Sequence, residues 1–223
     1  TPDSLYSVKL ESGRKRLLQT TEIKGNFSSS DYKVDRRFIE ARDGTKVPVS
    51  IVYKRTKFKK NKNPLFVYGY GSYGLSVDAG FSSSRISLLD RGFVFAIAHI
   101  RGGQELGRSW YEDGKIFNKL NTFYDFIDVT KALIDQGYGN LDRVYAGGGS
   151  AGGLLMGAVV NMEPELYKGI ISNVPFVDVI TTMSDPSIPL TTGEYKEWGN
   201  PENKEEFEYI LQYSPYDNIS ELN

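Results

Sequence analysis

The chain has 223 residues, 39% of them hydrophobic and 13% aromatic, which is enough for one large domain with a substantial core. Its 27 basic and 28 acidic side chains give a net charge of −1, which offers no electrostatic case for nucleic acid or an anionic membrane as a partner. It has no cysteine and one histidine, His99, which excludes disulfides, cysteine-based metal sites and histidine-rich metal sites. We therefore expect no metal and no cofactor. A chain without cysteine suits a reducing compartment, so we expect the protein in the cytoplasm, with the periplasm as the alternative.

The first 25 residues are too few to bury a core of their own. Residues 5–10 predict a short strand, and residues 17–24 are polar and compatible with β structure. The chain begins with Thr rather than Met, so we expect it to start inside a longer gene product. The longest apolar run, 93–98, is far too short to span a bilayer.

Residues 32–55 predict a β-hairpin. Its arms are 34–41 and 47–53, and an Asp-Gly turn joins them. Residues 54–63 form a basic connector, which we interpret as a solvated loop rather than a nucleic-acid site.

The next segment formally matches a dinucleotide-binding pattern. Residues 69–74 read G-Y-G-S-Y-G and follow a short predicted strand, 65–68. The third glycine of that pattern should open a helix, but residues 75–84 contain four serines and a further glycine. A better helix starts only at residue 85, so we consider a nucleotide site the weaker interpretation.

Beyond this point apolar strands alternate with segments of helical spacing, which predicts an α/β fold with a mostly parallel sheet. The predicted strands are 65–68, 93–100, 144–146 and 169–174, and the predicted helices are 85–90, 120–134 and 154–162. Asn121 or Thr122 is the candidate cap of the second helix. We expect a loop from Pro175 to Pro201 and a polar helix over 202–213.

The stretch Gly148-Gly149-Ser150-Ala151-Gly152 matches the nucleophile-elbow pattern G-x-S-x-G. In such an elbow the serine lies at a strained strand-to-helix turn that exposes its hydroxyl, and small neighbours are needed on both sides. The N–H of Ala151, at the start of the helix, would point toward a developing oxyanion. The alternative is a glycine-rich loop with an incidental serine.

A serine nucleophile needs a base, and in hydrolases of this architecture the order is Ser, then Asp or Glu, then His. No histidine follows Ser150, and His99 precedes it by 51 residues at the end of a predicted strand. We therefore interpret His99 as structural and expect the base to lie outside this chain.

Several motifs resemble those of the prolyl oligopeptidase family of serine peptidases. They are Y-G-Y-G-S-Y-G (68–74), H-I-R-G-G (99–103), G-G-S-A-G-G (148–153) and Y-S-P-Y-D-N (213–218). Residues 174–183 and 189–201 are similar to oligopeptidase B, the branch that cleaves after Arg and Lys. The resemblance covers essentially the whole chain.

The resemblance implies an α/β-hydrolase domain over 26–223 that is incomplete at its C-terminus. Residues 1–25 would be the last strand of a mostly missing β-propeller plus a linker. The triad Asp and His would follow Asn223, so the fragment alone would be inactive. The oligomeric state stays open.

The resemblance also assigns site residues. Ser150 would be the nucleophile, and the Tyr70 hydroxyl and Ala151 N–H the oxyanion donors. Glu194 would bind the basic side chain before the scissile bond, as a carboxylate binds a guanidinium. Asp78 would contribute to substrate binding.

Two departures from the family pattern affect specificity. Relatives commonly carry a second acid where this chain has Lys196, and the neighbouring Glu197 is a candidate substitute. The family often shows D-A-D where this chain reads Asp78-Ala79-Gly80. A preference for a second basic residue is therefore uncertain from the sequence.

The sequence thus predicts a serine oligopeptidase for short basic peptides. Two alternatives stay open. One is a prolyl-type peptidase or esterase of the same fold, and the other is a non-catalytic α/β module that binds a nucleotide at 69–74.

Overall fold

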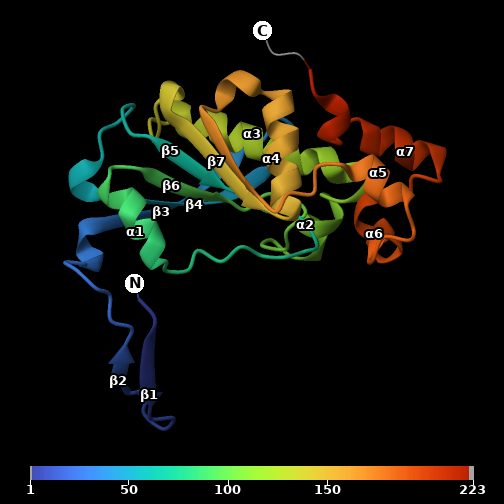
Figure 1. Ribbon diagram of the computed structural model, residues 1–223. Coiled ribbons are helices and arrows are strands. Elements are labelled where there is room, and N and C mark those ends of the chain that lie inside the picture. The colour runs from blue at the N-terminus through green and yellow to red at the C-terminus, as the bar shows by residue number, and fades with distance from the viewer. Residues whose placement is uncertain (1, 221–223) are drawn as a thin grey trace.

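The computed structural model describes residues 2–220, which form a central sheet flanked by helices (Figure 1). The six-stranded sheet has the order β3-β4-β6-β5-β7-β8. Its strands are β3 (Tyr32–Glu40), β4 (Lys46–Lys54), β5 (Leu65–Tyr68), β6 (Val94–Ala98), β7 (Val144–Gly149) and β8 (Gly169–Asn173). The pairs β6–β5, β5–β7 and β7–β8 are parallel, and the β3–β4 hairpin joins antiparallel at the β6 edge. The predicted fold class is confirmed.

Seven α-helices accompany the sheet in the described part of the chain. They are α1 (Ser83–Asp90), α2 (Arg108–Glu112), α3 (Lys119–Asp135), α4 (Ala151–Met162), α5 (Val179–Ser184), α6 (Thr191–Trp198) and α7 (Lys204–Leu211). Helices α3 and α4 cover one face of the sheet and α1 lies on the other (Figure 1).

The alternation of side chains along β6 explains the two apolar layers. Val94, Ala96 and Ala98 belong to the large core under α3 and α4, whereas Phe95 and Ile97 belong to a smaller cluster with Leu89 of α1. Successive residues of a strand point to opposite faces, so a strand that is buried on both faces is apolar throughout.

Two predictions about local structure are wrong. Helix α3 begins at Lys119, after a 3-10 turn over Ile116–Asn118, rather than at a cap on Asn121 or Thr122. Thr122 lies inside the helix, where its hydroxyl donates to the Arg101 carbonyl at 2.8 Å.

The segment after Pro175 is not a loop, because it contains the short helices α5 and α6. These helices are 6 and 8 residues long, too short to show a clear apolar period in the sequence. The Asp178 side chain caps α5 by accepting from the Thr181 N–H at 3.1 Å.

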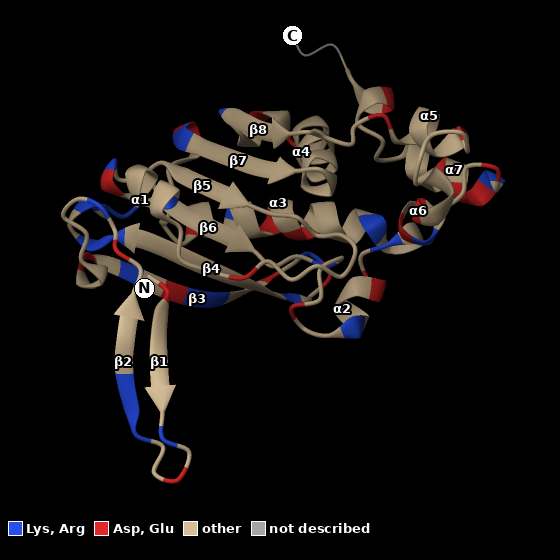
Figure 2. Cartoon of the chain, turned by 60° about the horizontal axis from the view of Figure 1, so that its bottom comes forward, with Lys and Arg blue, Asp and Glu red and all other residues tan. Residues whose placement is uncertain are grey.

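Residues near the N-terminus form a separate two-stranded sheet of β1 (Ser4–Val8) and β2 (Lys15–Thr20). The hairpin extends away from the main sheet, and every residue in both strands is exposed (Figure 2). The assignment of residues 1–25 to a propeller stays a prediction.

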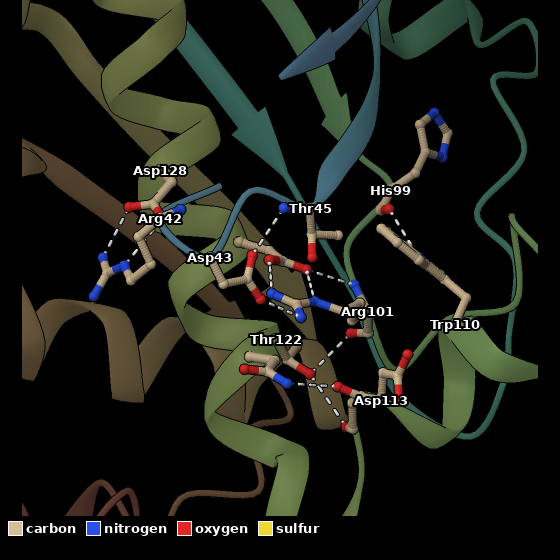
Figure 3. Close-up of polar contacts among 12 residues, drawn as sticks. Arg42, Asp43, Thr45, His99, Arg101, Trp110, Asp113, Thr122 and Asp128 are labelled. Atoms are coloured by element: carbon tan, nitrogen blue, oxygen red, sulfur yellow. Dashed lines mark hydrogen bonds and ion pairs between the residues drawn. The ribbon is translucent and has the colours of Figure 1, made fainter. Parts of the chain in front are cut away.

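A buried arginine ties the β3–β4 turn to α3 and to the end of β6. The Arg101 guanidinium donates to both carboxylate oxygens of Asp125, at 2.9 and 2.6 Å, and to Asp43 at 2.7 Å. Arg101 is 5% exposed and Asp125 is fully buried. Figure 3 shows Arg101 against Asp43, with Arg42 and Asp128 forming a second pair nearby.

Replacing Asp125 with Asn should destabilise the fold strongly, because it leaves a buried guanidinium without its charge partner. We expect a loss of about 3–5 kcal/mol in the free energy of unfolding, measured by urea denaturation. Asp128→Asn, on the same helix but against the more exposed Arg42, is the matched control and should cost about 1 kcal/mol. Equal losses for the two variants would contradict this ranking.

The Arg42–Asp128 pair should also contribute a pH-dependent stability. Burial alone would raise the pKa of Asp128, but hydrogen bonds from the Arg42 side chain and N–H outweigh it and lower that pKa below its usual value. The folded state then binds fewer protons than the unfolded state at acidic pH, so the stabilisation is present above about pH 4 and lost below it. We expect the stability difference between wild type and Asp128→Asn to shrink as the pH falls from about 4 through the lowered pKa of the folded state. A difference independent of pH would refute this assignment.

Candidate active site

Ser150 lies at the tip of a sharp turn between a strand and a helix. Strand β7 ends at Gly149, α4 begins at Ala151, and Ser150 between them has φ 56° and ψ −116°. A non-glycine residue in this region is strained, and such strain occurs at functional sites. Ser150 is exposed while Ala151 is 3% exposed, so the turn presents the hydroxyl to solvent. This is the geometry of a nucleophile elbow.

The glycines beside Ser150 are required by close backbone packing. A Cβ on Gly148 would lie 2.2 Å from the Gly152 carbonyl oxygen, and one on Gly153 would lie 2.5 Å from the Pro175 Cα. No side chain fits at either position without moving the backbone. This tight packing favours a nucleophile elbow over a glycine-rich loop that contains an incidental serine.

Tyr70 follows β5 and lies against the elbow. A Cβ on Gly152 would meet the Gly69 carbonyl oxygen at 2.8 Å and Tyr70 Cδ2 at 3.4 Å. Burial raises the pKa of the Tyr70 phenol, the carboxylates of Glu197 and Glu194 act in the same direction, and the nearby Ser150 hydroxyl lowers it. The net shift is upward, so the phenol keeps its proton at neutral pH and can donate a hydrogen bond.

Ala151 supplies a second potential donor. It is the first residue of α4, and the first N–H groups of a helix have no acceptor within it. The positive end of the helix dipole adds to the attraction for an anion at this point.

Glu194 of α6 reaches the same site from a distant part of the sequence. Its Oε2 accepts hydrogen bonds from the Tyr73 hydroxyl at 2.6 Å and from Trp198 Nε1 at 3.1 Å. No hydrogen bond within residues 2–220 uses Oε1. Glu194 is partly buried, so its carboxylate is fixed by one oxygen and has the other available to a ligand.

Aromatic side chains connect Ser150 to Glu194. The Phe176 N–H donates to the Ser150 carbonyl at 3.3 Å, and the Phe176 ring lies 5.4 Å from that of Trp198. The Tyr73 ring lies 5.6 Å from Trp198 and 6.5 Å from Tyr70. Sequence reasoning assigned no role to Tyr73, Phe176 or Trp198, although all three lie within the motifs that carry the family resemblance.

Glu197 is not a second substrate-binding acid, and that expectation is wrong. It is 3% exposed, and both its oxygens are occupied, Oε1 by the Tyr73 N–H at 2.9 Å and Oε2 by the Tyr111 hydroxyl at 2.6 Å. Its neighbour Lys196 is exposed. The helix therefore turns Glu197 into the protein while Lys196 faces solvent.

The structure does not bring Asp78 or His99 into this arrangement. Asp78 is exposed, and no hydrogen bond or ion pair among residues 2–220 involves it, so its role stays a prediction. His99 is 2% exposed, with Nε2 2.9 Å from both Ser50 Oγ and Arg36 Nη1. These contacts agree with the interpretation of His99 as structural.

The loop over 69–74 is unlike a phosphate cradle. The Tyr73 N–H is bound to Glu197, and the Gly74 N–H is bound to the Gly102 carbonyl at 3.0 Å. No helix opens at Gly74, because α1 begins at Ser83. A nucleotide would find these backbone donors already occupied.

Residues 2–220 contain no group of three His, Cys, Asp or Glu side chains placed to hold a metal ion. In the same residues, none of the helices has the length and apolar character needed to cross a bilayer.

Known proteins are similar to this chain over nearly its whole length. Dipeptidyl aminopeptidase BI of Pseudoxanthomonas mexicana is 57% identical over 98% of this chain and 30% of its own length, and Protease 2 of Moraxella lacunata is 49% identical over 98% and 32%. The structure of oligopeptidase B from Leishmania major matches with a TM-score of 0.93 at 50% identity, covering 98% of this chain and 30% of that one. The chain thus spans about 30% of the length of its relatives.

Family models agree with these relatives. Residues 20–71 match a family of unknown function, and residues 79–223 match the prolyl oligopeptidase family. The second match contains Ser150, Phe176, Glu194 and Trp198, whereas Tyr70 lies in the first match and Tyr73 between the two. The chain belongs to the prolyl oligopeptidase family.

Proposed function

We propose that this chain carries the nucleophile, the oxyanion donors and the substrate pocket of a serine peptidase that cleaves short peptides after Arg and Lys. One observation carries the proposal: an exposed serine on an elbow, a protonated tyrosine against that elbow and a half-occupied carboxylate meet in one place, although they come from β7, β5 and α6.

The chemistry follows from the roles of these groups. The Ser150 Oγ attacks the carbonyl carbon of the scissile bond while a base takes its proton. The Tyr70 hydroxyl and the Ala151 N–H donate to the oxyanion of the tetrahedral intermediate. Loss of the amine, which takes up the proton, leaves an acyl-enzyme on Ser150, and water then hydrolyses it.

The base has to come from elsewhere, because His99 is engaged with Ser50 and Arg36. We propose that the histidine and its orienting acid belong to the full-length protein outside residues 1–223. The isolated chain should then hydrolyse peptides slowly or not at all, since an unassisted serine hydroxyl is a weak nucleophile.

Specificity for a basic side chain rests on Glu194 and the rings around it. The free Oε1 of Glu194 can accept from a guanidinium or ammonium group. The ring of Tyr73, which is 38% exposed, lies beside this carboxylate and can stack on a planar guanidinium, whereas Trp198 is 1% exposed and orients the carboxylate through its Nε1–H. Relatives named Protease 2 and oligopeptidase B are consistent with a peptidase of this type.

A prolyl-type peptidase is the second candidate, and Phe176 favours it. The partly exposed Phe176 ring could pack against a proline ring, and some structural neighbours are prolyl endopeptidases. A carboxylate in the pocket distinguishes the two candidates, because it gives no advantage to an uncharged proline.

Tyr70→Phe in the full-length protein should lower kcat by about 100- to 1,000-fold, because it removes one oxyanion donor. KM should change little, since the bond forms mainly in the transition state. Steady-state kinetics on a short arginine peptide measures both constants. Ser150→Ala sets the baseline and should abolish hydrolysis; unchanged kcat in Tyr70→Phe would remove Tyr70 from the oxyanion site.

Glu194→Gln should lower kcat/KM for arginine and lysine peptides by about 10- to 100-fold, because it removes a charge-assisted hydrogen bond. The substrates should be matched peptides that differ only in having Arg, Lys, Pro or Phe before the scissile bond. Glu202→Gln, an exposed glutamate outside the pocket, is the control. Preferred cleavage after Pro that is insensitive to Glu194→Gln would favour the prolyl alternative.

A further inference from the structure

Lys119 is a buried lysine that the proposed reaction does not use. It is the first residue of α3 and is 1% exposed. Its Nζ donates to the Gly71 carbonyl at 2.7 Å, to Ser72 Oγ at 2.8 Å and to the Gly114 carbonyl at 3.2 Å. An ammonium group has three donors, so all of them are used. Burial lowers the Lys119 pKa to about 8, which leaves it charged at neutral pH.

Glu197 approaches the same loop from α6. Its carboxylate binds the Tyr73 N–H at 2.9 Å and the Tyr111 hydroxyl at 2.6 Å. Burial raises the pKa of Tyr111, and the hydrogen bond to Glu197 raises it further, so the phenol remains a donor. A buried cation and a buried anion therefore bind three consecutive residues, Gly71 to Tyr73.

These contacts matter because the loop has little conformational preference of its own. It contains Gly69, Gly71 and Gly74, and Gly71 has φ 71°. Behind the loop, a Cβ on Gly102 would lie only 2.0 Å from the Gly71 carbonyl oxygen, so the carbonyl packs directly against another backbone segment. Small shifts of this loop would move Tyr70, its second residue.

Removing each of these charged groups from water is unfavourable, and hydrogen bonds only offset that penalty. Apolar side chains at positions 119 and 197 would give an equally stable core, so stability alone does not account for the two charges. The Lys119 Nζ also lies 5.0 Å from the centre of the Trp198 ring, on the helix that carries Glu194. The two charges thus connect the oxyanion loop and the pocket helix to α3.

We propose that Lys119 and Glu197 are positioning residues, which fix the peptide groups of Gly71–Tyr73 and thereby hold the Tyr70 hydroxyl where the oxyanion forms. This inference rests on the proposed function. In this proposal neither Lys119 nor Glu197 touches the substrate, and both act through Tyr70.

Lys119→Met and Glu197→Gln test this in the full-length protein with a short arginine peptide. Each should lower kcat by about tenfold or more while KM changes by less than about threefold, as expected when transition-state stabilisation alone is lost. In a Tyr70→Phe background each should cost less than about threefold more, because residues that act through one group are not additive. Multiplicative losses, or a change confined to KM, would overturn the proposal.

The controls separate positioning from general stability. Lys131→Met removes a charge from the same helix and should leave kcat unchanged, since Lys131 pairs with Glu163 at the surface. Thermal unfolding identifies variants that fail to fold. If Lys119→Met does so, Ser72→Ala and Tyr111→Phe remove single hydrogen bonds to Lys119 and Glu197, and each should still lower kcat.

The activity of Ser150→Ala distinguishes failure of the proposed function from failure of the positioning role. Hydrolysis that persists in Ser150→Ala would reject the proposed function and this inference with it. Hydrolysis abolished in Ser150→Ala but undiminished in folded Lys119→Met and Glu197→Gln would reject the positioning role alone.

Discussion

The site depends on one close contact between the loops that follow two adjacent parallel strands. Strands β5 and β7 are neighbours in the sheet, so the segments after Tyr68 and Gly149 leave the same edge side by side. The Gly69 carbonyl packs so closely against Gly152 that no Cβ fits between them. This contact brings Tyr70 next to the elbow that carries Ser150. The rest of the site is arranged around that pair.

Buried charged side chains on neighbouring helices bind the loops around this contact. Asp125 and Lys119 of α3 are both buried; the Asp125 carboxylate accepts from the Arg101 N–H, and the Lys119 ammonium donates to the Gly71 carbonyl. Glu197 does the same from α6. Glycine-rich loops at the end of a sheet cannot be fixed by apolar packing alone, because they have few side chains to pack. Hydrogen bonds from buried ionic groups to peptide groups supply the missing restraint.

Local patterns in the sequence predict the scaffold better than the pocket. The apolar run of β6 and the glycines around Ser150 carry their structural meaning in a few adjacent residues. Helix α6 does not, because it is short and its stability comes from contacts with other segments. Tyr73 and Glu194 are 121 residues apart, and no periodicity indicates that they share a hydrogen bond. The wrong expectation for Glu197 has the same cause, since helix geometry turns it inward beside an exposed Lys196.

The contact between Gly69 and Gly152 also limits how the site can be redesigned. Side chains at Gly148, Gly152 or Gly153 would collide with backbone, so a library aimed at new specificity should leave these positions unchanged. Helix α6 is different on its outer side, because Lys196 is exposed and Glu194 is partly exposed. Within the proposed function, variation at these two positions would alter which side chain is recognised, while Glu197 on the buried side of the same helix keeps its contact with the loop that carries Tyr70.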